Sequence, residues 1–296
     1  MSAGYESTEE DRPLDPGLYL VATPIGNLED ITLRALRVLR SVDRIACEDT
    51  RQTQKLLNHF NIQTPTVSYH MHNEGPRADE LVTELKQGGR IAVVSDAGTP
   101  GIADPGAQIA AAAVAAGIAV FPIPGANAAI SGLVASGLPA DQFIFHGFLP
   151  AKAGQRKTAL EGLTRGEAVQ IFYEAPHRIL DTLADIETVF GGSQHIVLAR
   201  ELTKLHEEFL RGPVAEVRSQ LAARPSVRGE MVLMMELSPE QTLPENTRAS
   251  LGDEVSALMK TEGISEKDAL KRVARQRGMG KSEAYRELQR TLSRLR

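Results

Sequence analysis

The stretch Val94-Ser95-Asp96-Ala97-Gly98-Thr99-Pro100-Gly101 decides the fold, because an apolar run from residue 91 stops there at a loop of glycine and proline. The same pattern occurs twice more: residues 18–21 precede the loop 23–27, and residues 119–121 precede the loop 122–127. Each loop leads into an alanine- or leucine-rich stretch that is typical of a helix. Repeated strand, loop and helix predict a parallel sheet that binds a small ligand at the carboxyl ends of its strands.

The composition is that of a globular protein with room for two domains of ordinary size. The chain has 296 residues, of which 42% are hydrophobic and 24% charged, and no apolar run is long enough to span a membrane. No secretory segment follows Met1, and a single cysteine, Cys47, excludes an internal disulfide framework. These features predict a cytoplasmic protein, with Cys47 as a small buried hydrophobe.

The charge is unevenly distributed along the chain. Residues 264–296 hold ten Lys or Arg and four Asp or Glu, which leaves a charge of −11 on the other 263 residues because the total is −5. A basic tail on an acidic body favours an anionic partner such as RNA, although a solvated helical face has a similar composition. The candidate RNA contacts in the tail are Lys271, Arg272, Arg275 and Lys281.

The periodicity predicts five strands alternating with helices in the first half. The expected strands are 18–22, 44–46, 66–69, 90–95 and 119–123, and the expected helices are 32–40, 52–60, 76–87, 105–116 and 127–136. The second half has expected strands at 143–148, 169–173, 196–199, 208–211 and 231–237, with helices at 152–163, 177–189 and 214–222. Residues 200–211 leave no room for a crossover helix, so this second sheet is predicted to contain a hairpin and to be mixed.

These patterns divide the chain into an α/β protein of four parts. A disordered tail is expected at 1–16, α/β domains at 17–139 and 140–239, and a helical lobe at 247–296 after a polar linker. The lobe has three candidate helices, 248–260, 266–276 and 283–295, and resembles a helix-turn-helix. Ser265 and Asp268 have the spacing of a capping box at the second of these helices.

Acidic residues at strand ends are the first candidates for chemistry. The loop after the first strand lacks G-x-G-x-x-G, which disfavours a dinucleotide fold and a ribose-binding role for Glu48. Asp104 precedes Pro105 and is expected to cap the next helix, which leaves Asp96 free to face a ligand.

Five segments together carry a resemblance to a known family. They are residues 21–28, 48–51, 94–106, 172–178 and 199–204. In these segments the chain resembles the tetrapyrrole-methylase-type S-adenosylmethionine methyltransferases. Within that family it is similar to the branch that methylates the ribose 2′-oxygen of a cytidine in the decoding region of 16S ribosomal RNA. The likeness covers residues 17–237 in order, and the branch also carries a C-terminal helix-turn-helix-like domain.

The resemblance implies two consecutive α/β domains with the S-adenosylmethionine cleft between them, and a homodimer. The family's cofactor contacts fall on Pro24, Asp96, Gly98, Pro100, Gly101, Ile102, Pro124, Gly125, Ala126, Tyr173, Ala175 and Pro176. The chain departs from the family in its third loop, where many members have serines and this sequence has Ala126 and Asn127.

A ribose hydroxyl is a poor nucleophile, so a residue that accepts its proton would assist methyl transfer. The candidates are Glu48, Glu201 and Lys204, followed by Asp49, His70 and His72. The candidate RNA contacts outside the tail are Arg51, His70, His72, His177, Arg178 and Arg200. For residues 200–207 a surface strip of salt bridges is the alternative reading. No metal is expected, because His70 and His72 lack a third ligand nearby.

Two other functions stay open at this stage. A small-molecule methylase that acts on a tetrapyrrole would keep the fold and cofactor but leave the basic tail unexplained. A non-catalytic nucleic-acid-binding protein would be expected to have damaged cofactor loops, whereas loops 24–27 and 96–101 are intact. The resemblance therefore favours an enzyme that acts on 16S ribosomal RNA or the small ribosomal subunit.

Overall fold

The computed structural model describes residues 13–71, 73–163 and 166–237, and in the tail residues 255–256, 258–260, 263–276 and 284. The chain divides into two compact units, Met1–Ser238 and Pro239–Arg296. Among the helices described, none is long and apolar enough to cross a membrane.

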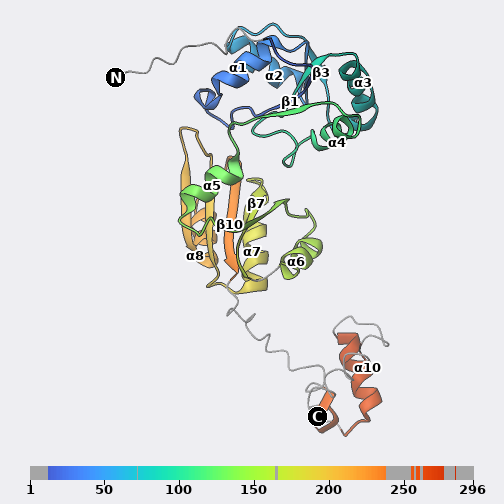
Figure 1. The fold of residues 1–296 in the computed structure, drawn as a ribbon. Coiled ribbons are helices and arrows are strands. Elements are labelled where there is room, and N and C mark those ends of the chain that lie inside the picture. Colours follow the sequence, from blue (N-terminus) through green and yellow to red (C-terminus); the bar gives the residue numbers. More distant parts are fainter. Residues whose placement is uncertain are drawn as a thin grey trace. The chain divides into compact units, whose positions relative to one another are not determined.

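The first sheet of unit 1 is entirely parallel. Its strands are β1 (Gly17–Val21), β2 (Arg44–Cys47), β3 (Thr66–Ser68), β4 (Arg90–Val94) and β5 (Val120–Ile123), in the order β3-β2-β4-β1-β5. Figure 1 labels β1 and β3 of this sheet. The predicted parallel sheet is therefore confirmed. Because β4, β1 and β5 are neighbours, the three glycine- and proline-containing loops follow adjacent strands and meet at one edge.

Helices cover both faces of this sheet. On one face α1 (Leu33–Ser41) and α2 (Thr50–His59) pack on residues such as Val21 and the buried Cys47. On the other, α3 (Glu74–Lys86) and α4 (Ala107–Ala115) pack on Leu18 and Val93. Alternate residues of each strand thus enter opposite cores, which explains the continuous apolar runs of the sequence. A short 3₁₀ helix, η1 (Leu28–Asp30), precedes α1.

The second sheet is mixed, as the sequence predicts. Its strands are β6 (Phe143–Phe148), β7 (Gly166–Glu174), β8 (His195–Arg200), β9 (Glu208–Pro213) and β10 (Met231–Leu237), in the order β6-β7-β10-β8-β9. Only β6 and β7 pair in parallel. The predicted hairpin is formed by β8 and β9, which pair from His195–Pro213 to Arg200–Glu208.

Helix α5 (Ala128–Ser136) joins the two halves in an unexpected way. It follows β5 of the first sheet, but Ala129 and Leu133 pack on the second sheet, where the helix contacts β7, β8 and β10. The opposite face of that sheet is covered by α6 (Ala153–Glu161), α7 (Ile179–Phe190) and α8 (Val214–Ala222). The boundary near residue 139 stays a prediction, but the sequence pattern gave no sign that α5 belongs to the second core.

The start of helix α4 differs from the sequence expectation in its position and in its cap. Helix α4 begins at Ala107, two residues late, and its N-cap is Gly106, with no side chain capping the helix. Gly106 has a φ of 139°, a conformation that favours glycine, and its N–H donates to Glu74 Oε1 at 3.1 Å. Asp104 therefore does not cap this helix, and the sequence-based assignment was wrong.

Unit 2 contains a helix, α10 (Glu266–Gln276), at the predicted place. The predicted Ser265–Asp268 pair is confirmed, because the Asp268 N–H donates to Ser265 Oγ at 3.2 Å and the Ser265 hydroxyl donates to the Asp268 carboxylate at 2.6 Å. Val255, Ala269, Val273 and Ala284 contribute to a small core. The predicted helices at 248–260 and 283–295 lie partly or mostly outside the described residues.

Candidate functional site

The first two loops form one platform at the edge of the parallel sheet. Thr23 and Gly98 exchange backbone hydrogen bonds of 2.9 and 3.0 Å, and the Thr23 hydroxyl donates to the Ser95 carbonyl at 3.1 Å. Gly98 has a φ of 84°, which favours glycine at this point of contact. The loops after β1 and β4 are therefore held in a fixed arrangement by their own backbones.

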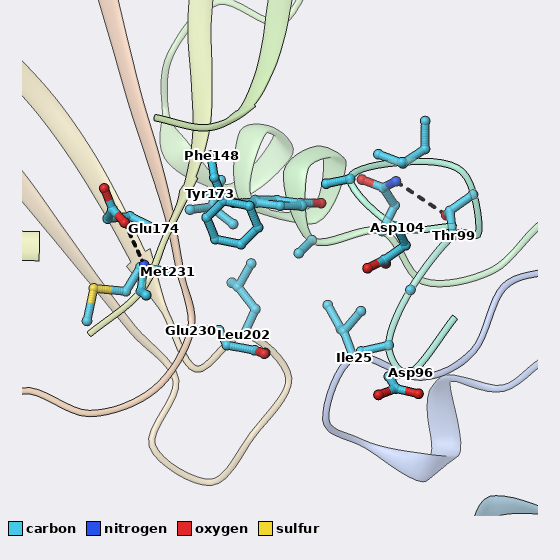
Figure 2. Close-up of a pocket in the computed structure, with 18 of the residues that line it drawn as sticks. Ile25, Asp96, Thr99, Asp104, Phe148, Tyr173, Glu174, Leu202, Glu230 and Met231 are labelled. Atoms are coloured by element: carbon cyan, nitrogen blue, oxygen red, sulfur yellow. Dashed lines mark hydrogen bonds between the residues drawn. The ribbon is translucent and has the colours of Figure 1, made fainter. Parts of the chain in front are cut away.

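The third loop is tied to the second through Thr99 and Asn127. The Thr99 hydroxyl donates to the Ala126 carbonyl at 3.2 Å, and Asn127 Nδ2 donates to Thr99 Oγ1 at 3.3 Å (Figure 2). Asn127 also caps α5, since its Oδ1 accepts the Ile130 N–H at 3.1 Å. The departure from the family pattern at Asn127 thus has a structural use, as a cap and a loop tie.

The second half of unit 1 faces these loops with apolar and aromatic side chains. Ile25 packs in the same buried cluster as Leu202 and Val232. Tyr173, near the end of β7, accepts the Ala129 N–H on its hydroxyl at 3.3 Å and stacks edge-on against Phe148. Burial raises the pKa of the Tyr173 hydroxyl, so it remains protonated near neutral pH.

Between the loops and this aromatic wall lies a cavity of about 470 Å³. That volume falls within the range of small-molecule sites. Figure 2 shows Asp96 and Asp104 on the side of the first sheet's loops, across the cavity from Phe148, Tyr173 and Glu230. The structure brings these predicted residues to the cavity wall: Glu48, Asp96, Gly98, Ile102, Tyr173, Ala175, Pro176, Glu201 and Lys204.

The remaining predicted cofactor residues lie in the same loops but not on the cavity wall. Pro24 and Pro100 are buried beneath it, whereas Pro124 and Gly125 are exposed on the third loop. A Cβ at Gly125 would lie 3.0 Å from the Ala22 Cβ, so a larger residue would push the loop off the end of β1. These residues shape the loops; the full group off the wall is Pro24, Pro100, Gly101, Pro124, Gly125 and Ala126.

The cavity contains more acidic groups than the sequence analysis singled out. Burial, then the charges of Glu48, Asp96 and Glu230, raise the pKa of Asp104 to about 6. Burial, followed by the Asp96 charge, likewise raises the pKa of Glu48. Asp104 was missed because an Asp-Pro pair is typical of a helix start, and the sequence shows neither its acidic neighbours nor the φ of 62° at Ala103.

Lys204 is held as an ion pair at the rim of the cavity. Its Nζ lies 3.0 Å from Glu201 Oε1 and 3.7 Å from Glu230 Oε2. A Cβ at Gly26 would collide with the Lys204 side chain, so the first loop and the 201–207 turn are in close contact. The strip of salt bridges considered as an alternative is thus present in part, but at the cavity rather than away from it.

The segment after β2 contains one charged residue with a structural role, Asp49, and one that is exposed, Arg51. The Asp49 N–H donates to Asp96 Oδ1 at 3.1 Å, and the Asp49 carboxylate caps α2 through the Arg51 N–H at 2.8 Å. Hydrogen bonds from Arg51 lower the pKa of Asp49 to about 2, which makes Asp49 a poor proton acceptor. Arg51 and the half-buried His70 do not line the cavity, and His72 lies outside the described residues.

Two arginines predicted to bind RNA are used inside the fold. Arg178 donates to the Leu149 carbonyl at 2.6 Å and pairs with the buried Glu174. Arg200 donates to Glu208 at 3.0 Å and to the Arg228 carbonyl at 2.9 Å. Helix α7 starts at residue 179 rather than 177, which leaves His177 in an exposed turn. Arg178 and Arg200 thus have partners within the fold, and their contact with RNA stays a prediction.

The tail presents two of its four predicted contacts in the described part of the chain. Lys271 and Arg272 are exposed on α10. Arg275 lies in the same helix, and Lys281 lies outside the described residues.

Comparison with known proteins identifies the family to which these loops belong. The pattern of the tetrapyrrole (corrin/porphyrin) methylases matches residues 17–218, which include the first sheet and strands β6 to β9 of the second but not β10. The match thus contains all three loops and the aromatic wall of the cavity.

Relatives at high identity carry one description. The chain is 48% identical over 273 residues to the ribosomal RNA small subunit methyltransferase I of Halalkalibacterium halodurans, over 90% of this chain and 93% of that protein. It is 45% identical over 268 residues to the protein of that name from Synechocystis sp., covering 90% and 95%. The Bacillus subtilis protein of that name is 44% identical over 272 residues, covering 90% and 92%.

Solved structures show the same fold at low identity. The uroporphyrin-III-C-methyltransferase of Thermus thermophilus matches with a TM-score of 0.52 and 20% identity, over 75% of this chain and 95% of that one. Diphthine synthase matches with a TM-score of 0.56 and 14% identity, over 74% and 89%. At this identity the likeness supports the fold alone.

Proposed function

We propose that this chain, which belongs to the tetrapyrrole (corrin/porphyrin) methylases, is a methyltransferase of small-subunit ribosomal RNA. The relatives at 44–48% identity support this assignment, because they are named for that activity and align over about nine-tenths of the chain. We propose further that the acceptor is the ribose 2′-oxygen of a cytidine in the decoding region of 16S ribosomal RNA.

The cavity carries the proposal, because its lining suits S-adenosylmethionine. When bound, this cofactor supplies a methyl group on a positively charged sulfur. Carboxylates at Glu48, Asp96 and Asp104 give the cavity a negative potential, which favours a cationic ligand. Ile102 and Tyr173 offer apolar surface for the rest of the molecule, and the chain thus provides both kinds of contact that the cofactor needs.

The residues that would hold the cofactor are those that the family resemblance implies. Asp96, Gly98, Ile102, Tyr173, Ala175 and Pro176 line the cavity and would contact it directly. Pro24, Pro100, Gly101, Pro124, Gly125 and Ala126 would set the conformation of the loops around it. Because the three loops are tied to one another before any ligand binds, little reorganisation would accompany binding.

For the chemical step, the chain must position a hydroxyl in line with the methyl group and take up its proton. Glu48 and Glu201 are carboxylates on the cavity wall, and we propose that they lie near the acceptor hydroxyl. Lys204 is held in ion pairs with Glu201 and Glu230, so we propose that it orients an RNA phosphate or hydroxyl rather than acting as a base.

RNA binding would combine the cavity rim with the basic tail. We propose contacts from Arg51, His70, His72 and His177, and from the tail residues Lys271, Arg272, Arg275 and Lys281. Phosphate contacts of this kind make binding weaken as salt rises. A homodimer, which the family resemblance implies, is part of the same proposal.

The test is methyl transfer from labelled S-adenosylmethionine to small ribosomal subunits that lack the modification, with naked 16S RNA as a second substrate. Mass spectrometry of the nucleosides should reveal 2′-O-methylcytidine. A chain that lacks residues 244–296 should bind the cofactor normally but the RNA more weakly. Equal RNA affinity of the truncated chain would remove the tail from the proposal.

A tetrapyrrole acceptor is the competing function. Transfer to a tetrapyrrole, with none to RNA or subunits, would establish that function instead. Failure to bind the cofactor would argue for a non-catalytic scaffold.

A further inference from the structure

Asp104 lines the cavity, but among the residues that the structure describes its carboxylate has no structural role as a helix cap or in an ion pair. It does not cap α4, because Gly106 is the N-cap and no side chain bonds to that helix start. Within the described part of the chain its carboxylate has no hydrogen-bond or ion-pair partner. Buried polar groups are ordinarily paired, so a half-buried carboxylate without a partner calls for a functional reason.

The loop around Asp104 is held rigidly on both sides. Gly101 donates its N–H to the Pro105 carbonyl at 3.1 Å, which closes a tight turn. Beyond the turn, the Gly106 N–H donates to buried Glu74, whose carboxylate also accepts the Tyr69 hydroxyl at 2.9 Å. These bonds connect the turn to α3 and to the end of β3, so they fix the backbone on both sides of Asp104.

The turn also contains a strained residue next to Asp104. Ala103 has a φ of 62°, in the left-handed region that L-residues with a side chain rarely adopt. Such a conformation is unfavourable and persists where surrounding contacts impose it. Backbone strain of this kind clusters at active sites and ligand clamps, which is where Asp104 lies.

Three other carboxylates surround Asp104 from different elements. Glu48 follows β2, Asp96 follows β4 and Glu230 precedes β10; each disfavours the charged form of Asp104. Across the cavity, Tyr173 is a neutral hydroxyl. The cavity's lysine, Lys204, is engaged by Glu201 and Glu230. Asp104 is thus the carboxylate with the strongest reason to take up a proton.

We propose that Asp104 accepts the proton of the acceptor hydroxyl during methyl transfer, with Glu48 and Asp96 as the neighbours that strengthen it as a base. This inference rests on the proposed function. Asp104 takes the proton as the hydroxyl oxygen forms its bond to the methyl carbon. The electron pair of the broken carbon–sulfur bond stays on the sulfur, which becomes neutral, and Asp104 ends as a neutral carboxylic acid.

The charges around these two carboxylates favour Asp104 over Glu48 as the proton acceptor. A pKa of about 6 for Asp104 lies close to neutral pH, where a general base is most effective. Burial and the Asp96 charge raise the pKa of Glu48 and His70 opposes that rise, whereas burial and the three charges that act on Asp104 all raise its pKa. At neutral pH most Asp104 carboxylates are ionised and ready to accept a proton.

The experiment compares wild-type protein with Asp104→Asn, Asp104→Glu and a control, Asp181→Asn, which changes an exposed aspartate on α7. Calorimetry gives the affinity for S-adenosylmethionine, and single-turnover transfer to small subunits gives the rate between pH 5 and 9. A third readout needs no ligand: carbon NMR of the aspartate carboxyls during a pH titration.

We expect Asp104→Asn to keep cofactor affinity within about threefold and to lose about 100-fold or more in rate. The fall in wild-type rate below about pH 6 should vanish in the residual activity of this variant. Asp104→Glu should recover part of the rate, Asp181→Asn should match wild type, and NMR should show one aspartate titrating near pH 6 that is missing in Asp104→Asn.

Other outcomes would overturn the proposal in distinguishable ways. An Asp104→Asn rate within a few-fold of wild type would remove Asp104 as the base and leave the proposed function intact. A loss of cofactor affinity that matches the loss in rate would make Asp104 a cofactor ligand instead. Wild-type protein that binds the cofactor but methylates neither subunits nor RNA would overturn the proposed function and this inference with it.

Discussion

Asp104 and Glu208 carry the same functional group in opposite surroundings. Glu208, in β9, accepts hydrogen bonds from Arg224 at 2.6 and 2.7 Å and from Arg200 at 3.0 Å, and Arg224 and then Arg200 lower its pKa to about 2. Asp104 has only acidic neighbours and burial, which raise its pKa to about 6. The contrast indicates that a carboxylate paired with cations of the same chain stabilises the fold. A carboxylate without such partners is available to bind a ligand or to take part in a reaction.

The strongest test of this contrast is Asp96→Ala, which removes a second carboxylate from the cavity. Asp96 accepts the Asp49 N–H and lines the cavity, so its loss removes negative potential and a tie between two loops. We expect cofactor affinity to fall about 100-fold or more, as for loss of a charge-assisted contact with the ligand. Calorimetry measures the affinity and circular dichroism checks the fold; an unchanged dissociation constant would refute the role of Asp96.

Lys204→Ala tests a residue that combines both roles, since Lys204 is paired within the chain and also lines the cavity. We expect turnover to fall at least about 10-fold with little change in cofactor affinity, because the proposed contact is with RNA. The matched control is Lys157→Ala, whose Nζ lies 3.4 Å from Asp185 Oδ1 away from the cavity. Equal turnover of the two variants would assign Lys204 to the fold alone.

Glu208→Gln should affect stability but not catalysis. The variant leaves Arg200 and Arg224 without their carboxylate partner, but solvent screens this half-buried cluster. We expect a loss of about 1 kcal/mol in unfolding free energy, which lowers the melting temperature by about 2–4 °C. Methyl transfer should match wild type at a temperature where both are folded. A loss of activity without a loss of stability would contradict the structural role of this cluster.

The smallest expected effect is a pH dependence of stability at Asp104. Its folded-state pKa of about 6 exceeds the ordinary value of 3.8, so the folded protein binds the extra proton between these values. The stabilisation that results is complete below the lower value and is lost as pH rises through the higher one. Asp104→Asn should therefore gain stability relative to wild type between pH 4 and 6, by about 1 kcal/mol or less because solvent screens the site. Denaturant titrations at both pH values would measure this, and a constant difference would contradict it.

Sequence patterns predicted the strands well because buried strands leave apolar runs with breakers on each side. The hairpin of β8 and β9 followed from loop length alone, since residues 201–207 are too few for a crossover helix. The packing of α5 was not predictable in this way. Its periodicity indicates a helix with an apolar face, but nothing local records which sheet the face meets.

The candidate site could be predicted from the sequence less completely than the strands of the fold. The three loops were expected from their glycine and proline residues, which allow close backbone approach, whereas the cofactor contacts within them came from the family resemblance and stay predictions. For Arg178 and Arg200 the sequence could not show that a carbonyl or carboxylate inside the fold accepts a hydrogen bond from each, and their contact with RNA stays a prediction. Asp104 was missed for the converse reason: its lack of a partner, and the acids around it, are properties of tertiary structure alone.

The placement of α5 has a consequence for how the molecule can be taken apart. A break in the chain after residue 139 would leave the first fragment with an apolar helix whose sheet is gone, and the second with a sheet face stripped of its cover. The two halves would then each expose surface that only the other can bury. Residues 13–237 should accordingly melt in a single cooperative transition, and severed halves should be insoluble apart but recover activity when refolded together.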